Sequence, residues 1–195
     1  ATLGGNLLQR PRCAYFRKRE LDCLKTGGDG CPAVEGHNRY LAVLGGGPCY
    51  AVQASSTSVA LMALDAALEI AGPEGNRTLP LADLYQLPTV DPTRETTLEE
   101  GEIIAAIVLP PLPAGTVNAY FKVRHKEAYD WAMAEAAASL TLSGSRVTDC
   151  RIVIGGVAPI PWRSVEAEAL LRGQTLSDAR IRAAAEAALA DAEPL

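Results

Sequence analysis

The pattern of hydrophobic and polar positions predicts a helix followed by a β-hairpin in the first half of the chain. Apolar residues occupy most of each turn over 58–67, behind a polar start at Ser55 and Ser56. Either serine hydroxyl can accept a hydrogen bond from the first free N–H groups of a helix, so we expect the helix to begin there. Residues 67–70 and 78–81 read as two short strands on either side of a turn rich in glycine, proline and asparagine.

A second hydrophobic run, over 103–109, predicts a buried strand that ends at a group of prolines. The three prolines within 110–113 fix the backbone in an extended form and make a stiff connector. We therefore place a domain boundary here, between a first domain at 1–113 and a second domain at 114–195.

The second domain is predicted to contain strands and then helices. Residues 117–124 and 147–157 have the composition of β-strands, whereas 129–142 is ambiguous, because its alanines favour a helix and its last residues alternate like a strand. Two helices are predicted at 165–171 and 178–192. The fold class is therefore α+β, and we expect the second domain to hold a three-stranded antiparallel sheet with helices.

A long segment rich in glycine and proline, residues 4–50, contains four of the five cysteines. We call it the cysteine segment, and its cysteines are Cys13, Cys23, Cys31 and Cys49. So many residues that interrupt helices and strands predict an irregular segment, and one of this length usually has a functional reason. The spacing contains no Cys-x-x-Cys pair, so from the residues alone buried thiols, a zinc site and an iron–sulfur cluster stay open. The fifth cysteine, Cys150, is expected to be a core thiol.

Composition and charge argue against some classes of protein. The 195 residues carry a net charge of -5, which disfavours non-specific binding to nucleic acid. No apolar run approaches the roughly 20 residues of a membrane span, and the N-terminus shows no signal-peptide pattern. The chain lacks an initiator methionine and stops just after a helical pattern, so we expect it to be part of a longer protein.

Five motifs occur in an order that resembles one family. They are Gly4-Gly5-Asn6-Leu7-Leu8-Gln9, Ala63-Leu64-Asp65-Ala66, Gly101-Glu102-Ile103-Ile104 with Leu109-Pro110, Tyr120-Phe121-Lys122-Val123-Arg124, and Gly155-Gly156-Val157-Ala158-Pro159-Ile160-Pro161-Trp162-Arg163. Together they resemble the FAD-binding (medium) subunit of the molybdenum hydroxylases, the xanthine dehydrogenase and aldehyde oxidoreductase family. The resemblance implies the C-terminal half of a PCMH-type FAD-binding domain, followed by a small α+β domain. The cysteines at about 10–50 resemble the insertion of a branch whose flavin subunit also carries a [4Fe-4S] cluster.

The resemblance also implies which residues bind the cofactors. For FAD they are Gly4, Gly5, Asn6, Leu7, Ser56, Ile103, Ile104 and Lys122, and for the [4Fe-4S] cluster they are Cys13, Cys23, Cys31 and Cys49. The glycines would let the backbone approach the flavin, and the charge of Lys122 would stabilise a reduced, anionic ring. Ser56 stands where many relatives have an aspartate that contacts the ribityl chain, and its hydroxyl can still hydrogen-bond there.

The function that the resemblance implies is electron transfer. In this family a molybdenum-cofactor large subunit oxidises the substrate, and electrons pass through the [2Fe-2S] clusters of a small subunit to the FAD subunit and on to an acceptor. We expect those two subunits as partners, no catalytic residue on this chain, and no catalytic role for the isolated His37 and His125. The expected location is cytoplasmic, with export to the periplasm beside a signal-bearing partner as the alternative. Two other functions stay open: an assembly module without flavin, and a domain stapled by zinc.

Overall fold

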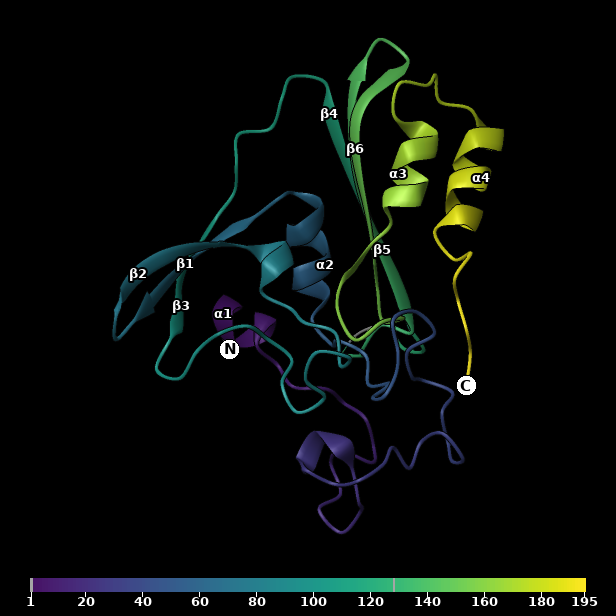
Figure 1. The fold of residues 1–195 in the computed structure, drawn as a ribbon. Coiled ribbons are helices and arrows are strands. Elements are labelled where there is room, and N and C mark those ends of the chain that lie inside the picture. The colour runs from purple at the N-terminus through teal and green to yellow at the C-terminus, as the bar shows by residue number, and fades with distance from the viewer. Residues whose placement is uncertain (1, 128) are drawn as a thin grey trace.

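A computed structural model describes residues 2–127 and 129–195, which form two antiparallel sheets with helices between and beside them (Figure 1). None of the helices in these ranges is long and apolar enough to cross a membrane. The helices are α1 (Leu3–Leu7), α2 (Ser56–Ala63), α3 (Val165–Leu171) and α4 (Asp178–Ala187), with short 3-10 turns at Leu24–Thr26 and Leu81–Asp83. The strands are β1 (Ala67–Gly72), β2 (Gly75–Pro80), β3 (Ile103–Val108), β4 (Thr116–Val123), β5 (Ala134–Ser143), β6 (Arg146–Gly155) and β7 (Trp162–Arg163).

The first sheet has the strand order β2-β1-β3 and shares a hydrophobic core with α2. The predicted hairpin is present, because β1 and β2 pair along their whole length. Leu68 and Ile70 alternate along β1 and are fully buried in one cluster with Val59 and Met62 of α2. The alternate apolar side chains of the strand and the apolar side chains of the helix therefore pack in the same core.

Strand β3 is not the buried strand that its hydrophobic run predicted. Ile103 at its start is 63% exposed, and Ile104 and Ile107 are only partly buried against the core. β3 lies at the edge of its sheet, and β1 is its partner among the described strands. An edge strand has an open side, so apolar composition alone does not ensure burial.

The second sheet has the strand order β4-β5-β6-β7. The ambiguous segment 129–142 becomes a strand from Ala134 onward, because pairing with β4 and β6 overrides the helix preference of its alanines. Helices α3 and α4 pack on one side of β6, in a cluster with Cys150 and Ile152, while α2 packs on the other side near Val153 (Figure 1). Cys150 is fully buried, which confirms the predicted core thiol.

A fourth strand corrects the expectation of a three-stranded sheet. Strand β7 consists of Trp162 and Arg163, which pair with Ile154 and Val153 of β6. Two residues are too few to show the alternation by which a strand is predicted, so β7 could not be predicted from its pattern.

Two helices end earlier than predicted. Helix α2 stops at Ala63 instead of residue 67, because Asp65 has φ 51°, in the left-handed region that commonly ends a helix. Helix α4 stops at Ala187 instead of residue 192. Beyond it, the N–H of Leu189 bonds to the carbonyl of Glu186, only three residues back, so the last turn tightens and the helix ends.

The two sheets are joined by chain and by a shared helix. The predicted proline connector at 110–113 is exposed and runs between β3 and β4. Helix α2 belongs to the core of the first sheet and also contacts β5 and β6 of the second. The division into domains at 1–113 and 114–195 stays a prediction.

The cysteine segment is irregular over most of its length, and its middle part extends away from both sheets (Figure 1). Its start is the exception, because Gly4 and Gly5 lie in helix α1. The hydroxyl of Thr2 caps this helix by accepting a hydrogen bond from the N–H of Gly5 at 3.0 Å. The glycine pair was predicted as part of an irregular segment, and the cap explains why it is helical instead.

A buried lysine ties the cysteine segment to the rest of the molecule. The ammonium of Lys25, only 5% exposed, lies 3.0 Å from the carboxylate of Glu95 and donates to the carbonyl of Pro92 at 2.9 Å. Arg10 contacts the same carboxylate at 3.0 Å. The ion pair and the hydrogen bond offset the free-energy cost of removing this ammonium group from water.

Candidate functional site

A groove of about 610 Å³ lies between helix α1 and strand β3. Four of the residues predicted to bind FAD line it: Gly4, Gly5, Ile103 and Ile104. The two glycines lie in helix α1 and the two isoleucines in strand β3, about 100 positions apart in the chain. The fold therefore brings two of the predicted motifs to one concave surface, and the open edge of β3 supplies its apolar wall.

Glycine at position 4 allows helix α1 to lie directly against β3. A Cβ added at Gly4 would stand 3.4 Å from the Cβ of Ile104, which is already a full contact. Any longer side chain would separate the helix from the strand and change the shape of the groove. The small residue thus sets the spacing of the two walls.

Three further predicted residues form a chain of polar contacts between α1, α2 and β4. Ser55, the N-cap of α2, accepts from the N–H of Ser58 at 3.1 Å and donates its hydroxyl to Asn6 Oδ1 at 2.7 Å. One residue on, Ser56 Oγ accepts from the Nζ of Lys122 at 3.1 Å. Asn6, Ser56 and Lys122 are therefore held together at the start of α2, although they come from three elements.

A buried carboxylate next to this cluster was missed by the sequence analysis. The pairing of β4 with β5 sets Lys122 opposite Glu135, and Tyr120 lies two residues away on the same face. The Tyr120 hydroxyl donates to the Glu135 carboxylate, which is only 4% exposed. Burial and then this hydrogen bond raise the pKa of Tyr120 to about 12. An acidic residue among alanines, at an inward position of the strand, indicates a buried carboxylate. The position can be recognised as inward only once 134–143 is known to be a strand.

Leu7, the last of the residues predicted to bind FAD, lies in the core. Its side chain is fully buried in the cluster with α2 and β1, and it does not line the groove. Its carbonyl accepts a hydrogen bond from the Tyr85 hydroxyl at 3.1 Å, and burial raises the pKa of that phenol. Leu7 therefore anchors α1, which holds Gly4 and Gly5 in place.

The four cysteines of the segment are all free thiols, with Cys23 and Cys49 buried and Cys13 and Cys31 half-buried. Burial raises the pKa of the Cys49 thiol, the charge of Lys25 opposes that shift, and the neighbouring Cys31 and Cys23 add to it. Cys31 and Cys23 are thus near enough to Cys49 to influence its thiol. In the part of the chain that the structure describes, no three cysteine, histidine or acidic side chains are arranged to hold a metal ion.

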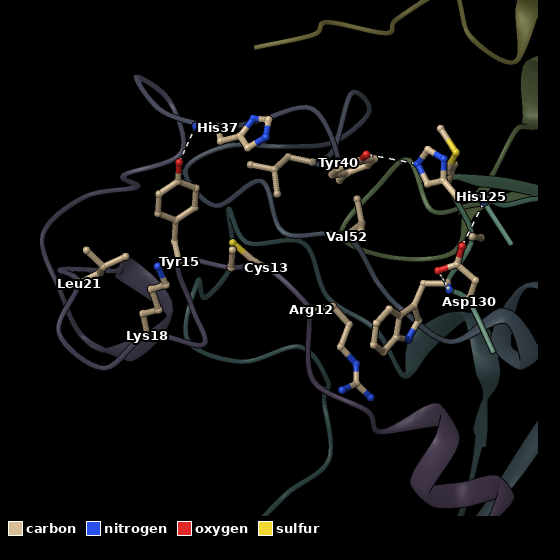
Figure 2. Close-up of a pocket in the computed structure, with 15 residues that line it drawn as sticks. Arg12, Cys13, Tyr15, Lys18, Leu21, His37, Tyr40, Val52, His125 and Asp130 are labelled. Carbon is tan, nitrogen blue, oxygen red and sulfur yellow. Dashed lines mark hydrogen bonds between the residues drawn. The ribbon is translucent and has the colours of Figure 1, made fainter.

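Cys13 lines a second cavity, of about 620 Å³, which none of the other three cysteines lines (Figure 2). This cavity separates the cysteine segment from the chain between β4 and β5, and His37 and His125 also line it. Neither histidine was predicted to have a catalytic role, because they stand 88 positions apart and only the fold brings them to one cavity.

Comparison with known proteins matches the chain to two families, one in each part of the chain. Residues 1–112 match the family described as the FAD binding domain in molybdopterin dehydrogenase. Residues 119–195 match the family described as the CO dehydrogenase flavoprotein C-terminal domain.

Individual relatives share the sequence and the fold. The chain is 44% identical, over 174 residues, to the aldehyde oxidoreductase FAD-binding subunit of Escherichia coli K12, covering 88% of this chain and 53% of that one. It is 37% identical to the carbon monoxide dehydrogenase medium chain of Hydrogenophaga pseudoflava over 68% of this chain and 44% of that one. A solved structure of carbon monoxide dehydrogenase from that organism superposes with a TM-score of 0.65 at 35% identity, over 72% of this chain and 47% of that one. The chain spans about half the length of the curated relatives it matches.

Proposed function

The chain belongs to the family of FAD-binding domains in molybdopterin dehydrogenases, and we propose that it is part of an electron-transfer flavoprotein subunit in a molybdenum hydroxylase complex. The observation that carries the proposal is the groove between α1 and β3. Four residues predicted to contact FAD line it, and the polar cluster at the start of α2 adds three more. Leu7 supports them from the core.

The residues present fit a flavin. The wall made by Ile103 and Ile104 is apolar, as the face of a flat ring requires, and the backbone at Gly4 and Gly5 is unobstructed by side chains. Ser56 offers a hydroxyl for a ribityl oxygen. Bound FAD would supply the capacity to accept and pass on electrons.

Lys122 is the residue of this chain that would respond to the flavin's charge. Its ammonium is half-buried and is held by Ser56 at 3.1 Å, so it is fixed in place before any ligand arrives. A fixed cation near the ring favours added negative charge there, because it needs little reorganisation. The Tyr120–Glu135 pair lies on the same face of the sheet and supports that position.

The names of two relatives support the proposed partners. One relative is named as a medium chain of carbon monoxide dehydrogenase and another as a medium subunit of nicotine 6-hydroxylase. We propose that this chain likewise assembles with a molybdenum-cofactor large subunit, where the substrate is oxidised, and with a small [2Fe-2S] subunit. The complex would be cytoplasmic, or periplasmic if a partner subunit carries an export signal.

Replacement of Lys122 by glutamine is expected to weaken FAD binding about tenfold, because a charge-assisted contact is lost while a polar hydrogen-bond donor is kept. The measurement is a fluorescence titration of the apo-subunit with FAD, together with the reduction potential of the bound flavin, which should fall. Lys126→Gln is the matched control, since Lys126 is exposed and lines neither cavity. Unchanged affinity and potential in Lys122→Gln would remove Lys122 from the site. A folded wild-type subunit in its complex that binds no FAD would favour the assembly-module function.

We also propose that the cysteine segment holds a [4Fe-4S] cluster. The chemistry of the donors fits, because four free thiols stand on one segment and the buried Lys25 would offset negative charge. The arrangement does not fit as it stands, since Cys13 lies in a separate cavity and no metal-holding group is formed among the described residues. We therefore assign no electron-transfer step to a cluster.

Iron and sulfide counts on protein purified without oxygen test this proposal. We expect about four irons and four sulfides per chain, with a broad absorption near roughly 400 nm. Cys31→Ser should abolish both, whereas Cys150→Ser should not, because Cys150 lies in the core of the second sheet. Zinc without sulfide would favour the stapled-domain alternative, and protein free of metal would contradict both.

A further inference from the structure

The second cavity lies outside the proposed flavin site. It encloses about 620 Å³, within the range of pockets that hold small organic ligands. None of the eight residues proposed for FAD lines it. One wall comes from the cysteine segment and the other from the chain that leads into β5, and Figure 2 shows Tyr15 and Cys13 on the first wall and His125 and Asp130 on the second.

Flat aromatic rings form much of the cavity wall. Tyr15, Tyr40 and Trp131 all line it. The hydroxyls of the two tyrosines already have hydrogen-bond partners. The Tyr15 hydroxyl accepts from the backbone N–H of His37, and the Tyr40 hydroxyl lies 3.2 Å from His125 Nε2 (Figure 2). With their hydroxyls occupied, these rings present mainly their apolar surface, which suits stacking on a planar ligand.

The charge of the cavity is positive. Arg12 and Lys18 line it, and the guanidinium of Arg12 lies 4.7 Å from the centre of the Trp131 ring. Asp130 is the carboxylate among the described lining residues, and its oxygens already accept three backbone N–H groups at 3.1 Å, those of His125, Lys126 and Trp131. An acid satisfied in this way is a poor partner for a further cation, so the two basic side chains are left to attract an anion.

We propose that this cavity is a binding site for a planar aromatic anion, a flat ring system that carries a carboxylate or sulfonate. The ring would stack between the aromatic walls, and the acid group would pair with Arg12, whose planar fork matches such a group and which already stacks on Trp131. Lys18 would add a second, less directional attraction. The site is separate from the flavin groove and does not depend on the flavin assignment.

Calorimetric titration of the full chain with anthraquinone-2-sulfonate tests the proposal, with neutral 2-(hydroxymethyl)anthraquinone as the matched ligand. We expect one site per chain and at least about tenfold tighter binding of the sulfonate. Arg12→Gln should weaken the sulfonate about tenfold and leave the neutral ligand almost unchanged. Arg12 is exposed on an irregular segment, so the glutamine variant should fold, which circular dichroism would check.

Arg17→Gln is the control variant, because Arg17 is exposed on the same segment but does not line the cavity. It should bind both ligands like the wild type. A second variant, Trp131→Leu, should weaken both ligands, since it removes a stacking wall. Equal affinity for the charged and the neutral ligand, or equal losses in Arg12→Gln and Arg17→Gln, would overturn the proposal. FAD content need not change in any of these variants, so the test is independent of the flavin assignment.

Discussion

Replacement of Glu168 by alanine is expected to lower the free energy of unfolding by about 3 kcal/mol. The Glu168 side chain is 2% exposed and sits between α3 and β6. Its carboxylate accepts two hydrogen bonds from Arg163, at 2.8 and 2.9 Å, and one from the backbone N–H of Ile152 at 3.1 Å. Alanine would leave a buried N–H without an acceptor and a cavity beside it.

The cost should fall at the lower end of the usual range for breaking a buried ion pair, about 3–5 kcal/mol. Arg163 is 36% exposed, so its freed guanidinium can turn toward water. Glu168→Gln keeps an acceptor for Ile152 and should cost less than alanine. Urea denaturation followed by circular dichroism would measure each value. Glu166→Ala, an exposed acid in the same helix, should change stability by less than about 1 kcal/mol. A similar loss in both alanine variants would contradict this account.

The sequence predicted the elements whose pattern is local. The β1–β2 hairpin, helix α2 and helix α3 each carry their periodicity and their caps within a few residues, as the hydroxyls of Ser55 and Ser164 illustrate. What could not be predicted depends on pairing across the chain. The alanines of β5 favour a helix by themselves, and only the neighbouring strands β4 and β6 make the segment extended.

The same distinction holds for the candidate site. The motifs at Gly4 and at Ile103 were named from resemblance, and the fold brings them to one groove. Glu135 was missed, because a single acid among alanines has meaning only when the strand and its inward face are known. The cavity at His37 and His125 was missed because irregular chain carries no periodicity from which its contacts could be predicted.

Which of the cysteines lie close together could not be predicted from the sequence. Residue type and number predict a metal site, but spacing does not say which thiols meet in an irregular segment. In the structure Cys49 is influenced by Cys23 and Cys31, whereas Cys13 faces another cavity. A bound cluster would itself supply the energy that gathers such ligands, because metal binding and folding are coupled. Counting iron and sulfide is therefore more decisive here than any pattern of residues.

Replacement of Gly155 by alanine is expected to destabilise the protein by about 1–3 kcal/mol and to loosen the start of α2. Gly155 ends β6 directly beneath that helix. An added Cβ would overlap Cγ2 of Val59 and stand 2.7 Å from Oε1 of the buried Glu135. Neither neighbour can move freely, since Val59 is in the core and Glu135 is held by Tyr120. The helix must therefore shift away from the sheet.

The shift should also reach the candidate flavin site, because α2 carries the serines that bind Asn6 and Lys122. We expect FAD affinity to fall with stability in Gly155→Ala, whereas Gly30→Ala should change neither, since an added Cβ there meets nothing within 4 Å. A double-mutant cycle makes the test specific. Val59→Ala removes the overlapping methyl, so the double variant should lose less stability than the sum of the two single changes. Strict additivity would show that the strain at Gly155 does not pass through α2, and the glycine would then have no part in positioning the site.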